Sequence, residues 1–241
     1  MLEKLVLIPV LQLTRVQLAM ELTLRLMRSR GLNRKTGGAT YNWSIPPGKT
    51  CRGITKICWK KCYARRLQAR RPNVAKAWQR CYELTQHPLF GAVLSEVLAR
   101  LPPGLFRLHV SGDFYAAWYF TVWHHALRAN PHLKPFAFTR SWRDASIKRA
   151  FARAGWPHWL MASTDHETGP APRQMREARM GDIRVRDVRA GKVEAPASMC
   201  LEQRDGVTTC DHCGACPAAK WGTGKFVDIK KPEPLITFAM H

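Results

Sequence analysis

Seven of the eight cysteines of this 241-residue chain fall into two clusters, and the long segment between them holds only one more, Cys81. The first cluster is Cys51, Cys58 and Cys62, and the second is Cys200, Cys210, Cys213 and Cys216. Thiolates are soft, anionic ligands that select zinc or iron–sulfur clusters. Three thiols in one cluster and four in the other are expected for two metal centres, of which the first lacks one protein ligand.

The second cluster ends in a C-x2-C-x2-C run followed directly by Pro217. This run resembles the core of a ferredoxin-type motif, in which short steps let successive thiolates surround one 4Fe-4S cluster. Cys200 supplies a fourth ligand from a small loop. Zinc is the alternative, because four cysteines also suit a tetrahedral structural zinc site.

A disulfide framework is the other way to use an even number of cysteines, and it requires an oxidising compartment. An apolar run covers residues 5–13, but Glu3 precedes it and no A-x-A-like cleavage site follows. The charged residues that come next exclude a membrane-spanning helix: Arg15, Glu21, Arg25 and Arg28. We therefore predict a cytoplasmic protein with reduced thiols and no membrane association. Cys81 lies in a helical pattern and is expected to be an inert core residue.

The charge of the chain is strongly asymmetric. The net charge is +22, and residues 22–82 contain 16 Lys or Arg and no Asp or Glu. A field of this size attracts polyanions, of which nucleic acid is the commonest. The candidate nucleic-acid contacts are Lys60, Lys61, Arg65, Arg66, Arg70 and Arg71. The alternative is a solvated basic face that offsets the charge of thiolates and clusters.

The middle of the chain alternates between strand and helix patterns. We predict buried strands over residues 106–113, 135–141 and 158–165, with helices over 116–129 and 144–154, the second capped by Asp144. Upstream, helices are expected over 58–68, 74–86 and 89–101, whereas 31–50 is expected to be a loop or short hairpin. Such alternation predicts an α/β fold with a partial (β/α) barrel-like parallel sheet.

Three segments follow from these patterns. Residues 1–35 are a leucine- and arginine-rich extension, 36–198 the α/β core with the three-cysteine site, and 199–241 a small cysteine-rich metal-binding appendage. Residues 166–198 are polar and expected to be irregular.

Polar residues follow each predicted strand. They are Ser111-Gly112-Asp113, then Thr139-Arg140-Ser141, then Ser163-Thr164-Asp165-His166. Ligands of parallel α/β proteins bind at the carboxyl ends of the strands. Turn chemistry explains any one of these runs, but three in succession predict a shared site. The first cysteine cluster would lie at the same end if it follows the first strand or enters the mouth of the barrel.

These residues resemble two known plans. The run from Cys58 to Arg65, CWKKCYAR, resembles the end of the radical SAM cysteine motif, and Ser111-Gly112-Asp113 takes the place of that superfamily's Gly-Gly-Glu. The spacing here is C-x6-C-x3-C instead of C-x3-C-x2-C, and Asp113 shortens the carboxylate arm. The closer resemblance is to the phage and plasmid "gene product 88" family, which shares the SIPPG, CYA, SGDF, TRSW and CxxCxxC segments across most of residues 36–220.

The radical SAM resemblance implies a set of roles. Cys51, Cys58 and Cys62 would hold a 4Fe-4S cluster whose fourth iron binds S-adenosylmethionine. Ser111, Gly112, Asp113 and Ser141 are the implied cofactor-binding residues, and Asp113, Arg140 and Asp165 the implied catalytic ones.

Three hypotheses follow from the sequence. The first is a radical SAM-like iron–sulfur enzyme acting on nucleic acid or another polyanion. The second is a non-enzymatic nucleic-acid-binding protein stabilised by zinc or iron–sulfur clusters. The third is a toxin–antitoxin or host-takeover factor.

Overall fold

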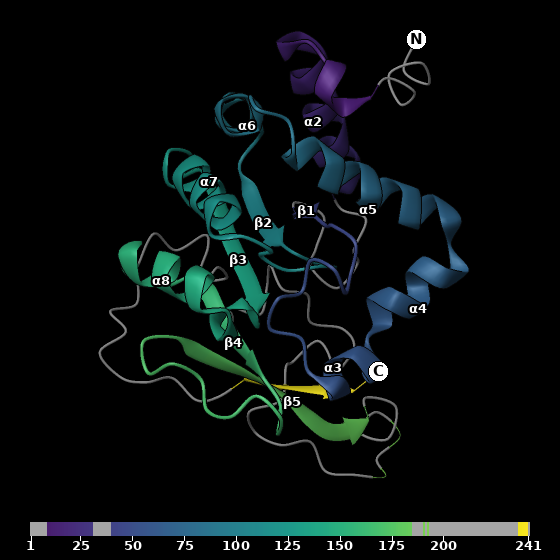
Figure 1. The fold of residues 1–241 in the computed structure, drawn as a ribbon, viewed down its shortest axis with the longest axis vertical. Coiled ribbons are helices and arrows are strands. Elements are labelled where there is room, and N and C mark those ends of the chain that lie inside the picture. The colour runs from purple at the N-terminus through teal and green to yellow at the C-terminus, as the bar shows by residue number, and fades with distance from the viewer. Residues whose placement is uncertain (1–8, 31–39, 185–189, 191, 193–235, 241) are drawn as a thin grey trace.

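A single parallel sheet organises the structure. The computed structural model describes residues 9–30, 40–184, 190, 192 and 236–240 (Figure 1). The six strands are β1 (Tyr41–Trp43), β2 (Gly104–Leu108), β3 (Leu133–Thr139), β4 (Leu160–Thr164), β5 (Arg176–Arg184) and β6 (Ile236–Met240). They lie side by side in chain order, and every neighbouring pair is parallel. The predicted α/β class with a parallel sheet is confirmed.

The predicted barrel is not shown. The pairings among the described residues form an open row from β1 to β6 and do not include a pairing of β1 with β6. The four cysteines of the predicted appendage, Cys200, Cys210, Cys213 and Cys216, lie outside the described residues.

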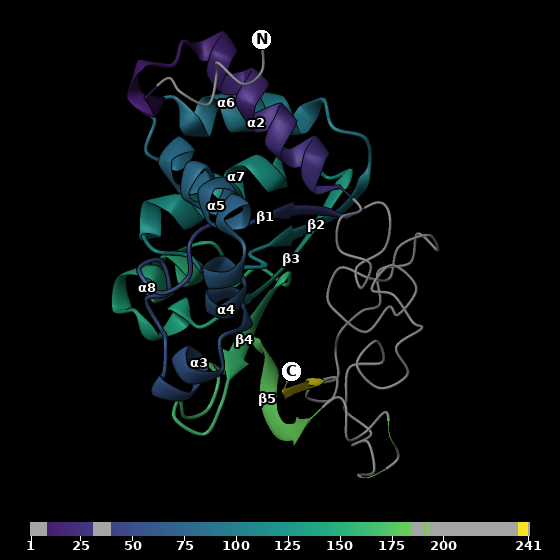
Figure 2. The ribbon, with the colours of Figure 1, turned by 90° about the vertical axis from the view of Figure 1, so that its right-hand side faces the viewer.

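Helices cover the sheet and the ends of its strands. They are α2 (Arg15–Ser29), α3 (Lys56–Lys61), α4 (Tyr63–Arg70), α5 (Pro72–Thr85), α6 (Phe90–Ala99), α7 (Ala117–Arg128) and α8 (Ala145–Arg153), with short 3-10 turns at Val10–Gln12 and Ser141–Arg143. Turning the molecule by 90° shows these helices on one side of the sheet (Figure 2). As predicted, Asp144 caps α8, and its Oδ1 accepts hydrogen bonds from the N–H groups of Ser146 (2.9 Å) and Ile147 (3.1 Å).

Alternation along the strands divides the side chains between the two faces. On β2, Phe106 and Leu108 belong to the main core, whereas Leu105 belongs to a small cluster with Phe136 and Phe138 on the opposite face. The main core is rich in aromatic rings, with Trp43, Trp123, Tyr119 and Phe114 fully buried within it.

Several local predictions were wrong. Residues 41–43, expected in a loop or hairpin, form β1, and the segment expected to be irregular contains β5. The last described residues, 236–240, form β6 of the core sheet. The helix predicted over 58–68 is two helices, because Cys62 adopts an extended backbone conformation (φ −61°, ψ 110°) between α3 and α4.

The helix α2 is an integral part of the core. Thr14 and Gln17 form a capping box at its start, with hydrogen bonds of 3.3 Å and 2.9 Å. Leu18, Leu22 and Leu26 are fully buried. The N-terminal segment predicted to be an extension therefore contributes a helix to the same hydrophobic core as the sheet.

A buried ion pair joins α2 to α5. Arg80 donates to Glu21 from Nε (2.7 Å) and Nη2 (2.8 Å), and the two side chains are 8% and 3% exposed. Arg25 lies 3.4 Å from the same carboxylate. Arg80 is thus a structural cation and does not belong to the exposed basic face.

We predict that Arg80→Ala lowers the free energy of unfolding by roughly 3–5 kcal/mol, because Glu21 would stay buried without its main partner. Urea unfolding measures the loss. Lys76→Ala, an exposed change on the same helix, should cost no more than about 0.5 kcal/mol. Similar small losses for both variants would contradict the structural role of the pair.

A second buried polar chain connects β1, β2 and α7. Trp43 Nε1 donates to the hydroxyl of Tyr119 (3.0 Å), which lies 3.0 Å from Nε2 of His109. The His109 ring packs edge-on against Phe114, with centroids 4.7 Å apart. Burial lowers the pKa of His109 to about 3, so the imidazole is neutral in the folded protein.

We predict that this histidine destabilises the fold in acid. Between pH 6.5 and about 3 the unfolded chain binds a proton that the folded chain excludes, so stability falls with falling pH by up to about 1.4 kcal/mol per unit. His109→Gln should remove this part of the slope and leave the slope above pH 6.5 unchanged. Urea unfolding from pH 4 to 8 checks this, with the exposed His166→Gln as control. Identical slopes for wild type and His109→Gln would refute the assignment.

Candidate functional site at the carboxyl ends of the strands

The three-cysteine segment lies at the carboxyl ends of β2, β3 and β4. We call residues 44–62 the cysteine loop, since they connect the end of β1 to α4 and contain Cys51, Cys58 and Cys62. Figure 1 shows α3 and α4 beside this end of the sheet. The contacts that hold the loop place its cysteines at this end of the sheet.

The first part of the loop packs on Ser111-Gly112. Ile45 N–H donates to the carbonyl of Ser111 (3.1 Å), which joins the end of β1 to the end of β2. Gly112 has φ +77°, and a Cβ atom there would lie 2.4 Å from Ile45 Cγ1 and 2.7 Å from Thr50 Oγ1. Only glycine fits this contact, so Gly112 sets the approach of the loop just before Cys51.

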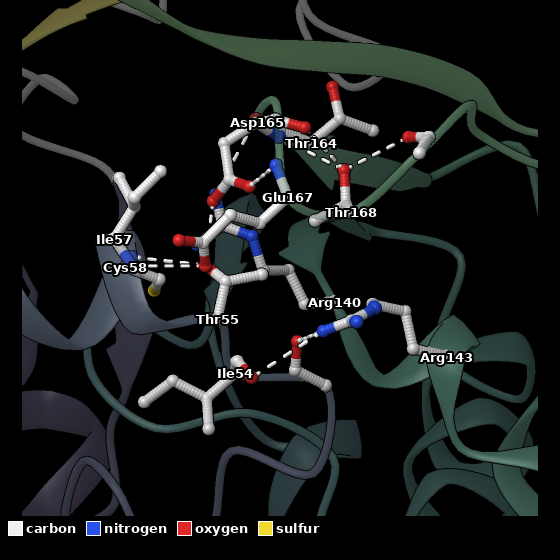
Figure 3. Close-up of polar contacts among 12 residues, drawn as sticks. Ile54, Thr55, Ile57, Cys58, Arg140, Arg143, Thr164, Asp165, Glu167 and Thr168 are labelled. Atoms are coloured by element: carbon white, nitrogen blue, oxygen red, sulfur yellow. Dashed lines mark hydrogen bonds and ion pairs between the residues drawn. The ribbon is translucent and has the colours of Figure 1, made fainter.

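The middle of the loop packs against the segment after β3. A Cβ atom on Gly53 would lie 1.7 Å from the carbonyl oxygen of Arg140. Arg143 Nη1 donates to the carbonyls of Gly53 (2.8 Å) and Ile54 (3.4 Å) (Figure 3). These contacts fix the backbone between Cys51 and Cys58.

A buried ion pair holds the last part of the loop. Arg140 Nη2 lies 3.0 Å from Asp165 Oδ2, and the same oxygen accepts a hydrogen bond from Thr55 Oγ1 (2.7 Å) (Figure 3). Thr55 in turn caps α3, because its hydroxyl accepts from the N–H of Cys58 (3.0 Å). The carboxylate of Asp165, just after β4, thereby positions α3, the helix that contains Cys58.

Two further contacts complete the anchoring. Glu167 Oε2 accepts a hydrogen bond from the N–H of Ile57 (3.3 Å), and its own N–H donates to Asp165 Oδ1 (2.9 Å). At the other end of α3, the sulfur of Cys62 caps α4 by accepting from the N–H of Arg65 (3.4 Å).

Asp113 connects the ends of β2 and β3. Its Oδ1 accepts from Thr139 Oγ1 (2.6 Å) and from the N–H of Phe114 (2.7 Å), and its Oδ2 accepts from the N–H of Arg140 (2.8 Å). Burial raises the pKa of Asp113, against these hydrogen bonds, which lower it. Asp113 is 6% exposed, and its contacts give it a positioning role whatever else it binds.

The three sulfurs are half-buried and share one electrostatic environment. Burial first, and then the negative charge of Asp113, raise the pKa of Cys51 to about 12. Burial raises the pKa of Cys58, whereas Arg140 lowers it. Cys58 and Cys62 each raise the pKa of Cys51, which places the three thiols within electrostatic reach of one another.

The described residues contain no cluster of three or more His, Cys, Asp or Glu side chains placed to bind a single metal ion. The three thiols therefore do not form a ready-made site for one ion. None of the helices in the described ranges is long and apolar enough to cross a membrane.

The structure brings nine of the predicted site residues to one end of the sheet. Those at this end of the sheet are Cys51, Cys58, Cys62, Ser111, Gly112, Asp113, Arg140, Ser141 and Asp165. Sequence reasoning missed Thr55, Arg143 and Glu167, which bind the loop or its supports. The sequence contained one signal for these contacts. Thr55 lies three residues before Cys58, which is the spacing between a helix-capping residue and the N–H group that it binds.

These features define an α/β protein whose parallel sheet carries a three-cysteine loop at the carboxyl ends of its strands. The family model "Gene product 88" matches residues 23–225, and the chain belongs to this family of phage proteins. The resemblance to that family predicted from the sequence is thereby confirmed.

Two phage proteins are similar to part of the chain. The "Gene 88 protein" of Mycobacterium phage L5 is 31% identical over 118 residues, and that of Mycobacterium phage D29 is 29% identical over 118 residues. Each match covers 44% of this chain and 49% of the relative, so the chain spans about half the length of the curated relatives it matches. No solved structure matches the chain. These comparisons give no support to the radical SAM resemblance and assign no activity.

We predict that Asp165→Ala releases the cysteine loop. The change leaves Arg140 buried without its carboxylate and removes the acceptor of Thr55, so the free energy of unfolding should fall by roughly 3–5 kcal/mol. The alkylation of Cys58 under native conditions should become much faster. Peptide mass mapping of the labelled protein measures this rate. The buried Cys81 reports global unfolding and should stay protected.

Asp144→Ala is the matched control. It removes the cap of α8 and should cost about 1 kcal/mol without accelerating the alkylation of Cys58. If both variants label Cys58 at the same rate, the ion pair does not hold the loop.

Proposed function

We propose that the cysteine loop binds a 4Fe-4S cluster through Cys51, Cys58 and Cys62 and leaves one iron without a protein ligand. The single observation that carries this proposal is the anchoring of the loop at the carboxyl ends of three successive parallel strands by Gly112, Arg140 and Asp165. Parallel α/β proteins bind their ligands at this end of the sheet.

The residues present suit such a cluster. Three thiolates are the soft ligands that iron–sulfur clusters require. A four-iron cluster is wider than one ion, so its ligands stand further apart than those of a mononuclear site. The half-buried Cys51 and Cys58 limit access of water, and the N–H of Arg65 already donates to the sulfur of Cys62, an interaction of the kind that tunes cluster potentials.

Binding of the cluster requires the loss of protons. Burial and Asp113 raise the pKa of Cys51 to about 12, so this thiol is protonated at neutral pH until metal displaces its proton. Burial also raises the pKa of Cys58, and Arg140 only partly opposes this rise. Assembly should therefore be favoured by rising pH.

The chemistry proposed for this site is radical SAM-like. When bound, a reduced cluster of this type supplies one electron to a ligand on its open iron. The proposed part of the chain is to position that ligand. Ser111, Gly112, Asp113 and Ser141 remain the predicted cofactor-binding residues, and the buried hydroxyl of Ser111 has no partner among the described residues. Asp113, Arg140 and Asp165 are the residues proposed to act on that ligand.

The second candidate function is non-enzymatic nucleic-acid binding by a metal-stabilised protein. The exposed cations of α3 and α4 favour it, because they need no cluster chemistry to attract a polyanion. The C-terminal cysteines are proposed to hold a second 4Fe-4S cluster, with zinc as the alternative. Metal analysis of the purified protein distinguishes iron from zinc.

We expect anaerobically purified protein to be brown, with about eight irons per chain if both clusters form. The triple variant Cys51→Ala, Cys58→Ala, Cys62→Ala should lose about four irons, and the wild-type cluster should support reductive cleavage of S-adenosylmethionine. Iron and zinc analysis, visible spectra and product assay measure these outcomes.

Cys81→Ala is the control, because Cys81 is a buried core residue on α5 and is not one of the three loop thiols. It should keep the full iron content. A wild-type protein that contains zinc and no iron would sink the cluster proposal. A brown protein that never cleaves S-adenosylmethionine would reject the radical SAM-like chemistry and favour the second candidate function, non-enzymatic nucleic-acid binding.

A further inference from the structure

The cysteine loop continues directly into an exposed cationic surface. We call this surface the α3–α4 face and define it by its exposed basic side chains: Lys56, Lys60, Lys61, Arg65, Arg66, Arg70 and Arg71. The nearest carboxylates along the chain are Glu21 and Glu83, outside residues 22–82. Glu21 is buried in its pair with Arg80. The face therefore presents positive charge without intramolecular neutralisation from its own segment.

Exposed apolar side chains are interleaved with these cations. Trp59 and Tyr63 are each 41% exposed and Leu67 is 38% exposed, at a spacing of four residues. The guanidinium of Arg65 lies over the Trp59 ring, 4.5 Å from its centroid. A ring and a guanidinium stacked in this way form a flat surface on which nucleic-acid bases can stack.

Both rings are fixed to the candidate site. The hydroxyl of Tyr63 donates to the carbonyl of Val110, just after β2. The Trp59 ring packs against Gly48, where a Cβ atom would come within 2.9 Å of the ring. Trp59 also lies between Cys58 and Cys62 in the sequence. A ligand stacked on these rings is thus held next to the sulfur atoms.

We propose that the α3–α4 face binds single-stranded nucleic acid and presents it to the cysteine loop. Cations that follow a backbone and rings that stack on bases are the combination by which proteins bind single strands. A duplex shows phosphates but hides the faces of its bases, so it would use only the cations. This inference deepens the proposed function, because it names the substrate class of the same site.

The test is the affinity of the whole, cluster-loaded protein for fluorescent oligothymidylate and oligouridylate of about twenty nucleotides. Fluorescence anisotropy at several salt concentrations compares these with a duplex of equal length. Both single strands should bind more tightly than the duplex, and the two arms separate DNA from RNA. Polyglutamate, which carries charge without bases, should compete poorly.

Stacking is tested by Trp59→Ala, which should weaken single-strand binding about tenfold and leave duplex binding nearly unchanged. Trp118→Ala is the matched control, since Trp118 is 46% exposed on α7. Its affinity should equal that of wild type. Equal affinity of wild type for single strand and duplex, or no effect of Trp59→Ala, would overturn the proposal.

The cations are tested by changing Lys60, Arg66 and Arg70 to Gln together. Single-strand affinity should fall, and the salt dependence should decrease by roughly 0.7 in slope for each phosphate that the variant no longer neutralises. The control changes Lys148, Arg149 and Arg153 on α8 to Gln, three exposed cations with the same total charge. If both triple variants bind the strand with equally reduced affinity, net charge and not the α3–α4 face attracts the strand.

The two proposals fail separately. Iron content and colour are measured on the same samples as binding. Brown protein that does not prefer single strands overturns this inference and leaves the cluster. Iron-free protein that binds single strands through Trp59 overturns the cluster and leaves the face.

Discussion

The buried pair of Arg140 and Asp165 is the interaction on which the candidate site depends. Asp165 follows β4 and Arg140 follows β3, so the pair fixes the spacing of two strand ends. The same carboxylate oxygen accepts the hydroxyl of Thr55, which caps α3 beside Cys58. Isolated buried charges are costly, and a pair is tolerated only when its remaining hydrogen-bonding capacity is used. Here the cysteine loop supplies one of those hydrogen bonds, which couples its position to the sheet.

The loop itself contains no carboxylate. The carboxylates that hold it follow β4: Asp165 accepts from the hydroxyl of Thr55, and Glu167 accepts from the N–H of Ile57. The placement of the three thiols therefore depends on the folded sheet. The segment contacts this end of the sheet through the hydroxyl of Thr55 and the carbonyls of Gly53 and Ile54, whereas its Lys56, Lys60 and Lys61 are exposed.

The sequence predicted the parts whose signals are local. The strands around Phe106, Phe136 and Met161 are rich in apolar residues, and the cap at Asp144 has the usual residue type, so both were predicted correctly. The strand β1 has three residues and lies within a Gly- and Pro-rich stretch, which gives no strand pattern. Among the described side chains of β5, only Ala178 is buried. Its pairing with β4 and β6 is set by the neighbouring strands and cannot be seen in its own pattern.

The site shows the same division. That Cys51, Asp113 and Asp165 meet could be predicted, because strand ends of a parallel sheet share one edge. The role of each group there could not be predicted, because it depends on partners distant in sequence. The sequence predicts that Asp113 binds a cofactor, yet in the structure its oxygens accept hydrogen bonds from Thr139 and Arg140 at the end of the neighbouring strand. Gly112 is likewise predicted to face the cofactor, whereas a side chain there would collide with Ile45 and Thr50. The Ser-Gly-Asp segment thus supports the cysteine loop through contacts that any ligand of the loop would inherit. A ligand-binding role for these residues would therefore act through the placement of the sulfurs as much as through direct contact.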